Sequence, residues 1–208
     1  MAERNLLIEQ ELEALYHVSR MLNSPAPLRD KLQGVLEVLH EQAGMRSGML
    51  ALREQQTDAL VVCSVRHGGG NPDRGLVRYE PGEGLMGAIL DEGYTIVVER
   101  IADEPRFLGK LGLYDPALPF IGAPIRVGND DLVGVLAAQP VDGSLLGERA
   151  RFMEMVANLI AQSVEMLRDM EQRQRDLTDE RDRLKQSLRK NYGFENIIGH
   201  SLGHFATR

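Results

Sequence analysis

The chain has 208 residues, 43% of them apolar and 26% charged, a balance typical of folded globular proteins that excludes disorder along the whole length. The formal net charge of −7 argues against sequence-independent binding of nucleic acid, which requires a surplus of Lys and Arg. A single cysteine, Cys63, excludes an internal disulfide, a zinc site built from several thiolates and a four-cysteine iron–sulfur cluster.

The apolar runs of the sequence are short. None approaches the roughly 18 residues that a transmembrane helix requires, and the acidic N-terminal stretch does not resemble a signal peptide. We therefore expect a cytoplasmic protein that makes no contact with a membrane. Cys63 lies in the strand-like run ALVVCSV, where we expect a small buried apolar side chain and not a reactive thiol.

Two helices are predicted before any strand. The first covers residues 5–22, where apolar side chains recur at intervals of three and four and mark one helical face. The second covers residues 28–43 and ends at Gly44. The predicted face of the first helix consists of Ile8, Leu12, Leu15, Val18 and Leu22, and that of the second of Leu28, Leu32, Val35, Leu36 and Leu39.

Six short β-prone runs separated by turn residues follow. The turn composition of residues 128–131 predicts an antiparallel hairpin between the last two runs. Several runs are almost wholly apolar, which favours a sheet covered on both faces, by helices on at least one of them. The six runs are residues 48–53, 59–66, 77–80, 94–99, 120–127 and 132–139, and a Gly-rich loop and short helix at residues 82–91 interrupt the series.

A single long helix is predicted from residue 146 to about residue 191. Its first half carries a broad apolar stripe that can cover a sheet, made of Phe152, Met155, Val156, Leu159, Ile160 and Val164. Its second half narrows to Met170, Leu177 and Leu184 at seven-residue steps, which favours a two-stranded coiled coil and hence a homodimer. A solvated single helix remains the alternative.

Motifs for catalysis and metal binding are incomplete. The stretch GHSLG at residues 199–203 matches the nucleophile elbow of serine hydrolases, but no acidic residue follows Ser201, so the triad order is impossible. His200 and His204 stand four residues apart without a neighbouring carboxylate or cysteine. We therefore expect no catalytic residues and no metal site.

The stretch PGEGLMG at residues 81–87 is the strongest candidate for binding chemistry. Its glycines permit a tight turn into a helix whose free N–H groups can receive an anion, although such turns also occur for steric reasons alone. The chain contains no G-x-x-x-x-G-K-[ST] phosphate loop, so hydrolysis of nucleotides is not expected within it.

The order of these elements resembles a GAF domain over residues 5 to about 165. The likeness rests on GEGLMG at residues 82–87, API at 123–125 and GVL at 134–136. It implies an α/β (α+β) fold of the GAF/PAS type, with a central antiparallel sheet of about six strands flanked by helices and a long C-terminal helix. The expected organisation is a regulatory domain at 1–165, a coiled-coil signalling linker at 166–191 and, at 192–208, the N-terminal edge of an AAA+ module.

The stretch ADEPRFLGKLGLYDPALPFIGAPI and the tail YGFENIIGHS are similar to NifA-type activators, which act with sigma-54 RNA polymerase on nitrogen-fixation genes. The resemblance implies a regulatory sensor, not an enzyme, that controls an attached AAA+ ATPase. Its effector would be a small anion such as 2-oxoglutarate, or a regulatory protein of the NifL or PII type, and no cofactor is required. The alternative is a protein-interaction and dimerisation module without a small ligand.

The candidate site residues follow from this resemblance. A dicarboxylate needs cationic side chains and backbone donors. The candidates for binding are Arg78, Gly84, Met86, Arg106 and Phe107, with Tyr114 and Phe120 as walls of the pocket, and those for the dimer contact are Leu12, Leu15, Met170, Leu177 and Leu184. A GAF-type methionine sulfoxide reductase is not expected, because its redox cycle requires several cysteines.

Overall fold

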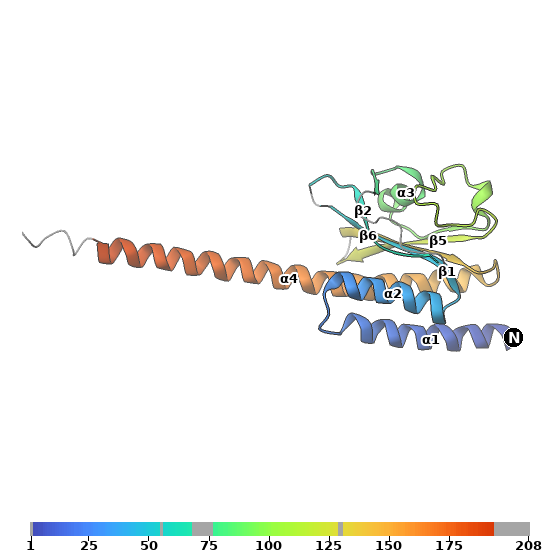
Figure 1. The fold of residues 1–208 in the computed structure, drawn as a ribbon, viewed down its shortest axis with the longest axis horizontal. Coiled ribbons are helices and arrows are strands. Elements are labelled where there is room, and N and C mark those ends of the chain that lie inside the picture. The colour runs from blue at the N-terminus through green and yellow to red at the C-terminus, as the bar shows by residue number, and fades with distance from the viewer. Residues whose placement is uncertain (1, 55, 68–76, 129–130, 194–208) are drawn as a thin grey trace, which may run out of the picture. The chain divides into compact units, whose positions relative to one another are not determined.

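The computed structural model describes residues 2–54, 56–67, 77–128 and 131–193, and the chain divides into two compact units, Met1–Glu165 and Met166–Arg208 (Figure 1). The helices are α1 (Ala2–Leu22), α2 (Leu28–Gln42), α3 (Gly84–Glu92), the 3₁₀ turn η1 (Ile101–Asp103) and α4 (Leu146–Gly193). The strands are β1 (Met45–Arg53), β2 (Leu60–Arg66), β3 (Arg78–Tyr79), β4 (Ile96–Val98), β5 (Phe120–Val127) and β6 (Asp131–Pro140).

The strands form one antiparallel sheet in the order β3-β2-β1-β6-β5-β4. The predicted hairpin between the last two runs is confirmed, because β5 and β6 pair from Ile121 opposite Ala138 to Val127 opposite Asp131. Residues 129–130 of its turn lie outside the described residues. The sheet therefore places β1 and β6, which are far apart in the sequence, side by side at its centre.

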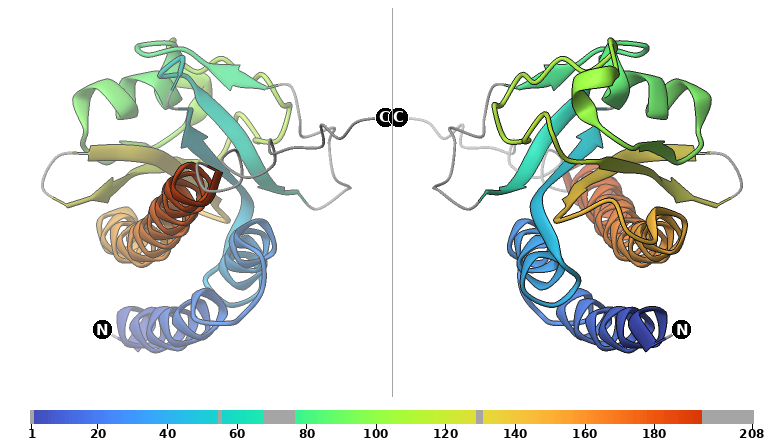
Figure 2. Two further views of the ribbon diagram at one scale, coloured as in Figure 1. Left: turned by 90° about the vertical axis from the view of Figure 1, so that its left-hand side faces the viewer. Right: turned by 90° about the vertical axis from the view of Figure 1, so that its right-hand side faces the viewer.

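Helices cover both faces of the sheet. α1, α2 and the part of α4 within the first unit lie on one face, and α3 lies on the other (Figure 1). α1 is farther from the sheet than α2 and this part of α4 (Figure 2). Each face has its own apolar core, one around Leu36, Leu50 and Phe152 and one around Met49, Ile89 and Phe120. Two covered faces explain why the central strands are apolar along almost their whole length.

The predicted face of the first helix requires a correction. Val18 and Leu22 are buried as predicted, but Ile8 and Leu12 are exposed. The rest of the buried face consists of Leu7, Glu11 and Ala14. Leu15, which is partly buried, lies at the margin of the core. Apolar residues occur on more than one side of this helix. The spacing of apolar residues alone therefore does not distinguish the predicted face from a face shifted by one residue along the sequence.

The long helix is confirmed, with one change in its packing. Phe152, Val156, Ile160 and Val164 are buried as predicted, but Met155 is 46% exposed. Within the second unit, the side chains of Met170, Leu177 and Leu184 are exposed in the single chain. The AAA+-like tail at 194–208, including Ser201, His200 and His204, lies outside the described residues.

The remaining boundaries differ by a few residues at the strand ends. The fourth strand shortens from 94–99 to Ile96–Val98 and the third from 77–80 to Arg78–Tyr79, whereas the first is longer and begins at Met45. None of the helices in the described part of the chain is long and apolar enough to cross a membrane.

Candidate ligand-binding site

A small cavity lies between the sheet, α3 and the loop that precedes β5. Its free volume is about 20 Å³, which is room for roughly one water molecule. Eight consecutive loop residues, 107–114, line it, and we refer to residues 107–117 as the cover segment. The other lining residues are Met49 of β1, Tyr79 of β3, Leu85 and Met86 of α3, and Phe120 of β5.

The Gly-rich motif places the start of α3 beside this cavity. Gly82 and Gly84 have positive φ values of 72° and 63°, which favour glycine and turn the chain tightly into the helix. At Gly87 a side chain would collide with the carbonyl oxygen of Glu80. The turn therefore requires glycine for steric reasons, and the first turn of α3 contributes Leu85 and Met86 to the lining of the cavity.

Aromatic rings form the inner wall of the cavity. Phe107, Tyr114 and Phe120 contact one another edge to face, with ring centroids 5.5 to 6.1 Å apart. The Tyr114 hydroxyl is buried and has no hydrogen-bond partner among the described residues. Burial raises the pKa of Tyr114, and Tyr79 raises it further, so the hydroxyl keeps its proton. It is therefore a buried hydrogen-bond donor without a partner among the described residues.

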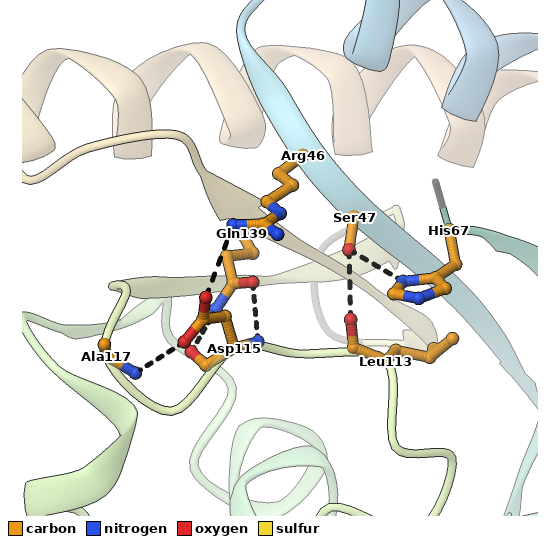
Figure 3. Close-up of polar contacts among 7 residues, drawn as sticks. All are labelled: Arg46, Ser47, His67, Leu113, Asp115, Ala117 and Gln139. Carbon is orange, nitrogen blue, oxygen red and sulfur yellow. Dashed lines mark hydrogen bonds and ion pairs between the residues drawn. The ribbon is translucent and has the colours of Figure 1, made fainter. Parts of the chain in front are cut away.

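The cover segment is fixed to the sheet at its C-terminal end (Figure 3). The buried amide of Gln139 on β6 both donates to the Asp115 carbonyl oxygen and accepts from the Asp115 N–H, each at 2.9 Å. The Ser47 hydroxyl donates to the Leu113 carbonyl oxygen at 3.0 Å and lies 3.3 Å from His67 Nδ1. Because Ser47 is 1% exposed and its proton is used in this bond, we interpret it as an anchor and not as a nucleophile.

Lys110 fixes the N-terminal part of the cover segment. Lys110 Nζ lies 2.7 Å from Glu83 Oε1 and 4.7 Å from the centre of the Tyr79 ring, and it donates to the Arg78 carbonyl oxygen at 2.7 Å. The hydrogen bond from Lys110 lowers the pKa of Glu83, as does a backbone hydrogen bond at Glu80. Among the described residues that line the cavity, Lys110 is the charged one.

Four of the predicted ligand residues line the cavity: Met86, Phe107, Tyr114 and Phe120. Gly84 lies next to it, since a side chain there would meet Leu108, 2.8 Å away. The two predicted arginines do not line it. Arg78 pairs with Glu54 at 2.8 Å, and Arg106 pairs with Glu104 at 2.9 Å.

Lys110, Gln139, Ser47 and Tyr79 were not among the predicted site residues. Lys110 had a usable signal, because it lies in the same glycine-flanked loop as Arg106. Gln139 had a weaker one, namely a polar residue at the end of an apolar strand. Ser47 and Tyr79 carry no local pattern that separates them from ordinary strand residues.

The described residues include no group of three or more His, Cys, Asp and Glu side chains that could hold a metal ion. Cys63 lies on β2, and its thiol donates to the Leu50 carbonyl oxygen at 3.2 Å. Burial raises the pKa of Cys63 to about 12. Cys63 is partly buried and not fully buried as predicted, whereas its raised pKa agrees with the expectation of an unreactive thiol.

Among curated proteins, the chain is similar to Nif-specific regulatory proteins. It is 37% identical over 200 residues to the Nif-specific regulatory protein of Azotobacter vinelandii and 36% identical over 206 residues to that of Klebsiella oxytoca. These alignments cover 94% and 95% of the chain but only 38% and 39% of the relatives. The chain thus spans well under half the length of these proteins.

Solved structures share the fold. The nlh2 GAF domain of A. aeolicus in an inactive state superposes with a TM-score of 0.69 and 24% identity, covering 77% of the chain and 98% of that domain. Free methionine-R-sulfoxide reductase from Neisseria meningitidis, in complex with its substrate, superposes with a TM-score of 0.64 and 19% identity, covering 77% of the chain and 91% of the reductase. These likenesses establish the fold and not a shared activity.

The family model of the GAF domain matches residues 27–164, which include the sheet, α3 and the cover segment. The chain therefore belongs to the GAF domain family, and its sequence is similar to Nif-specific regulatory proteins over almost its entire length.

Proposed function

We propose that this chain is the sensor region of a NifA-type, sigma-54-dependent activator of nitrogen-fixation genes. A small ligand binds in the cavity beneath the cover segment, and its presence controls an AAA+ ATPase that follows in the full-length protein. Similarity to Nif-specific regulatory proteins supports the regulatory role. The protein acts in the cytoplasm, where its gene-regulatory target would lie.

One observation carries the ligand part of this proposal. Tyr114 lines the cavity, and its hydroxyl is buried without a hydrogen-bond partner among the described residues. An unsatisfied buried donor costs free energy, and native structures rarely retain one without a reason. A ligand with an acceptor atom in the cavity would satisfy this hydroxyl.

The ligand that fits best carries negative charge at one end. Lys110 lines the cavity and would supply the positive charge if it exchanged its partner Glu83 for the ligand, and the aromatic wall suits a short carbon chain. 2-Oxoglutarate has this chemistry. Its second carboxylate would require Arg106 to exchange Glu104 for the ligand.

Isothermal calorimetry with 2-oxoglutarate tests this proposal. We expect saturable binding to the wild-type chain, weakened at least tenfold by Lys110→Gln and weakened by Arg106→Ala. Arg100→Ala is the matched control, because Arg100 is exposed and pairs with Asp103 away from the cavity. No heat at millimolar ligand would refute the 2-oxoglutarate version.

A second function is favoured by the size of the cavity. About 20 Å³ cannot hold a dicarboxylate unless the cover segment moves. If it does not move, the domain is a protein-interaction module regulated by a NifL-type or PII protein. Thermal-shift assays distinguish the two, because a metabolite that raises Tm supports the sensor, whereas a shift with the partner protein alone supports the module.

The transmission step requires a second copy of the chain. α4 is continuous from Leu146 to Gly193, and Leu177 and Leu184 of its second unit are exposed in the single chain. Their seven-residue spacing suits a homodimeric coiled coil whose packing the ligand would alter. Sedimentation analysis should show a dimer that Leu177→Lys dissociates and that Gln172→Lys, an exposed position outside the heptad spacing, leaves intact.

A further inference from the structure

Glu11 is a charged residue on the buried face of α1. The other members of that face are Leu7, Ala14, Val18 and Leu22, all apolar. Glu11 is 7% exposed, and its Oε1 atom is buried without a hydrogen-bond partner among the described residues. A carboxylate in this position loses much of its hydration and gains no donor for this oxygen, whereas a neutral carboxyl group loses far less.

The first turn of α4 supplies the charged neighbours of this carboxyl group. Arg149, which is 6% exposed, favours the ionised form of Glu11, and Glu148 opposes it. The Arg149 guanidinium already donates to the carbonyl oxygens of Ala43 at 3.1 Å and of Ser144 at 3.2 Å. The Arg149 guanidinium therefore joins the end of α2 to the start of α4. Its positive charge compensates the negative charge of an ionised Glu11 only in part.

The other ionisable groups of this junction have partners of their own. Glu148 forms an ion pair with Arg4 of α1 at 3.1 Å, and Asp142, in the loop before α4, lies 4.0 Å from Arg149. Between α1 and α2, Nδ1 of His17 on α1 lies 2.8 Å from the amide oxygen of Gln42 on α2. Nδ1 of His40 on α2 lies 2.9 Å from the carbonyl oxygen of Met45. None of these contacts supplies a donor to the buried Oε1 atom of Glu11.

We propose that the N-terminal half of α1 is a proton-dependent latch on the first turn of α4, closed while Glu11 is neutral and loosened when Glu11 ionises. This inference concerns the helical face of the domain and is independent of any ligand in the cavity on the other face. Opening the latch would separate Leu7 and Glu11 from the junction and would expose the turn that contains Glu148 and Arg149.

The direction of the pH effect follows from the two states of the carboxyl group. Burial raises the pKa of Glu11 from 4.5 to about 7 in the closed latch, with Arg149 lowering it and Glu148 raising it. In the open latch the group is hydrated and its pKa returns toward 4.5. Closure is therefore fully favoured below pH 4.5, weakens as the pH rises toward 7, and is weakest above that.

Hydrogen exchange of the chain at pH 5.5 and pH 8 tests the latch. Protection factors, which remove the intrinsic pH dependence of exchange, should fall on the order of tenfold for the α1 amides between these two values, more than for the sheet. Glu11→Gln keeps the shape of the side chain without its charge, so α1 should stay protected at pH 8. Glu13→Gln is the matched control, because Glu13 is on the same helix but exposed.

A pH-independent protection of α1 in the wild-type chain, or the same loss of protection in Glu11→Gln, would overturn the proposal. A second measurement does not depend on how the variant folds. The carboxyl carbon of Glu11, observed by NMR in ¹³C-labelled wild-type protein, should titrate with a midpoint between pH 6 and 8. A midpoint below pH 5 would show that the closed state holds the charged form and would refute the latch.

Discussion

Gln139 and Asp115 are joined by two hydrogen bonds of 2.9 Å, so that the side chain of a buried sheet residue pairs with the backbone of the cover segment as a neighbouring strand would. The Asp115 side chain extends the contact, since its Oδ1 accepts from Ala117 N–H at 3.0 Å and its Oδ2 lies 3.3 Å from Arg46. The segment that closes the cavity is therefore held by the centre of the sheet and not by its own loop contacts alone.

Replacing Gln139 with Leu should release this end of the cover segment. Two backbone groups of Asp115 would lose their partners, and we expect the free energy of unfolding to fall by about 2 kcal/mol. Chemical denaturation measures the loss, and hydrogen exchange should show it concentrated in residues 107–117. Gln10→Leu, at an exposed position of α1, should change stability by less than about 0.5 kcal/mol. An equal effect of both substitutions would contradict the role of Gln139.

Tyr114→Phe should stabilise the ligand-free domain. The substitution removes a buried hydroxyl without a partner among the described residues and keeps the ring in the aromatic wall. We expect the free energy of unfolding to rise by about 1 kcal/mol, measured by denaturation in the absence of ligand. Tyr94→Phe serves as control, because Tyr94 is 58% exposed. A clear loss of stability in Tyr114→Phe would mean that the hydroxyl already has a partner.

Gly87→Ala should be destabilising although alanine favours helices. The added methyl group would press against the Glu80 carbonyl oxygen and lie 2.9 Å from backbone atoms of Gly82, so the turn before α3 must shift. We expect a loss of about 1 to 3 kcal/mol. Gly147→Ala, in the first turn of α4 with nothing within 4 Å of the added atom, should instead gain about 0.5 to 1 kcal/mol. Thermal unfolding of the two variants measures both changes in stability. A loss in Gly87→Ala with a gain in Gly147→Ala would show that close packing at Gly87 outweighs helix propensity.

Cys63 should react with iodoacetamide only through unfolding. With its pKa raised to about 12 by burial, the thiol is almost wholly protonated at pH 8. Mass spectrometry should show slow modification of the native chain and rapid modification in denaturant, at a single site because the chain has one cysteine. Fast modification of the native protein would contradict the prediction, because it would show that the Cys63 thiol is accessible and readily ionised in the folded chain.

The order of elements was predictable because its signals are local. Turn residues bound each strand, the 128–131 turn specifies the hairpin, and the helix from 146 lacks internal breakers apart from Gly147. The buried face of α1 was not predictable by the same means. A spacing argument selects Ile8 and Leu12 over a face that contains Glu11, since nothing local indicates that a carboxyl group will be buried.

The candidate site was predictable only in its apolar part. Phe107, Tyr114 and Phe120 converge because apolar rings seek the core whatever their exact partners. The position of a cationic side chain depends on the acidic residue with which it pairs. Arg78 pairs with Glu54 because the fold brings the two together, and the residues next to Arg78 in the sequence do not indicate this. The anchoring of the cover segment by Gln139 joins positions 24 residues apart and is likewise a property of the fold.

The outermost strands of the sheet are short, with two residues in β3 and three in β4. The unpaired N–H and C=O groups of an edge strand can pair with a strand of another molecule and so start aggregation. Short edge strands expose few such groups. If the chain dimerises through α4 as proposed, the short edge strands leave little room for a second, sheet-to-sheet contact between copies. High expression should therefore yield discrete oligomers and not fibres.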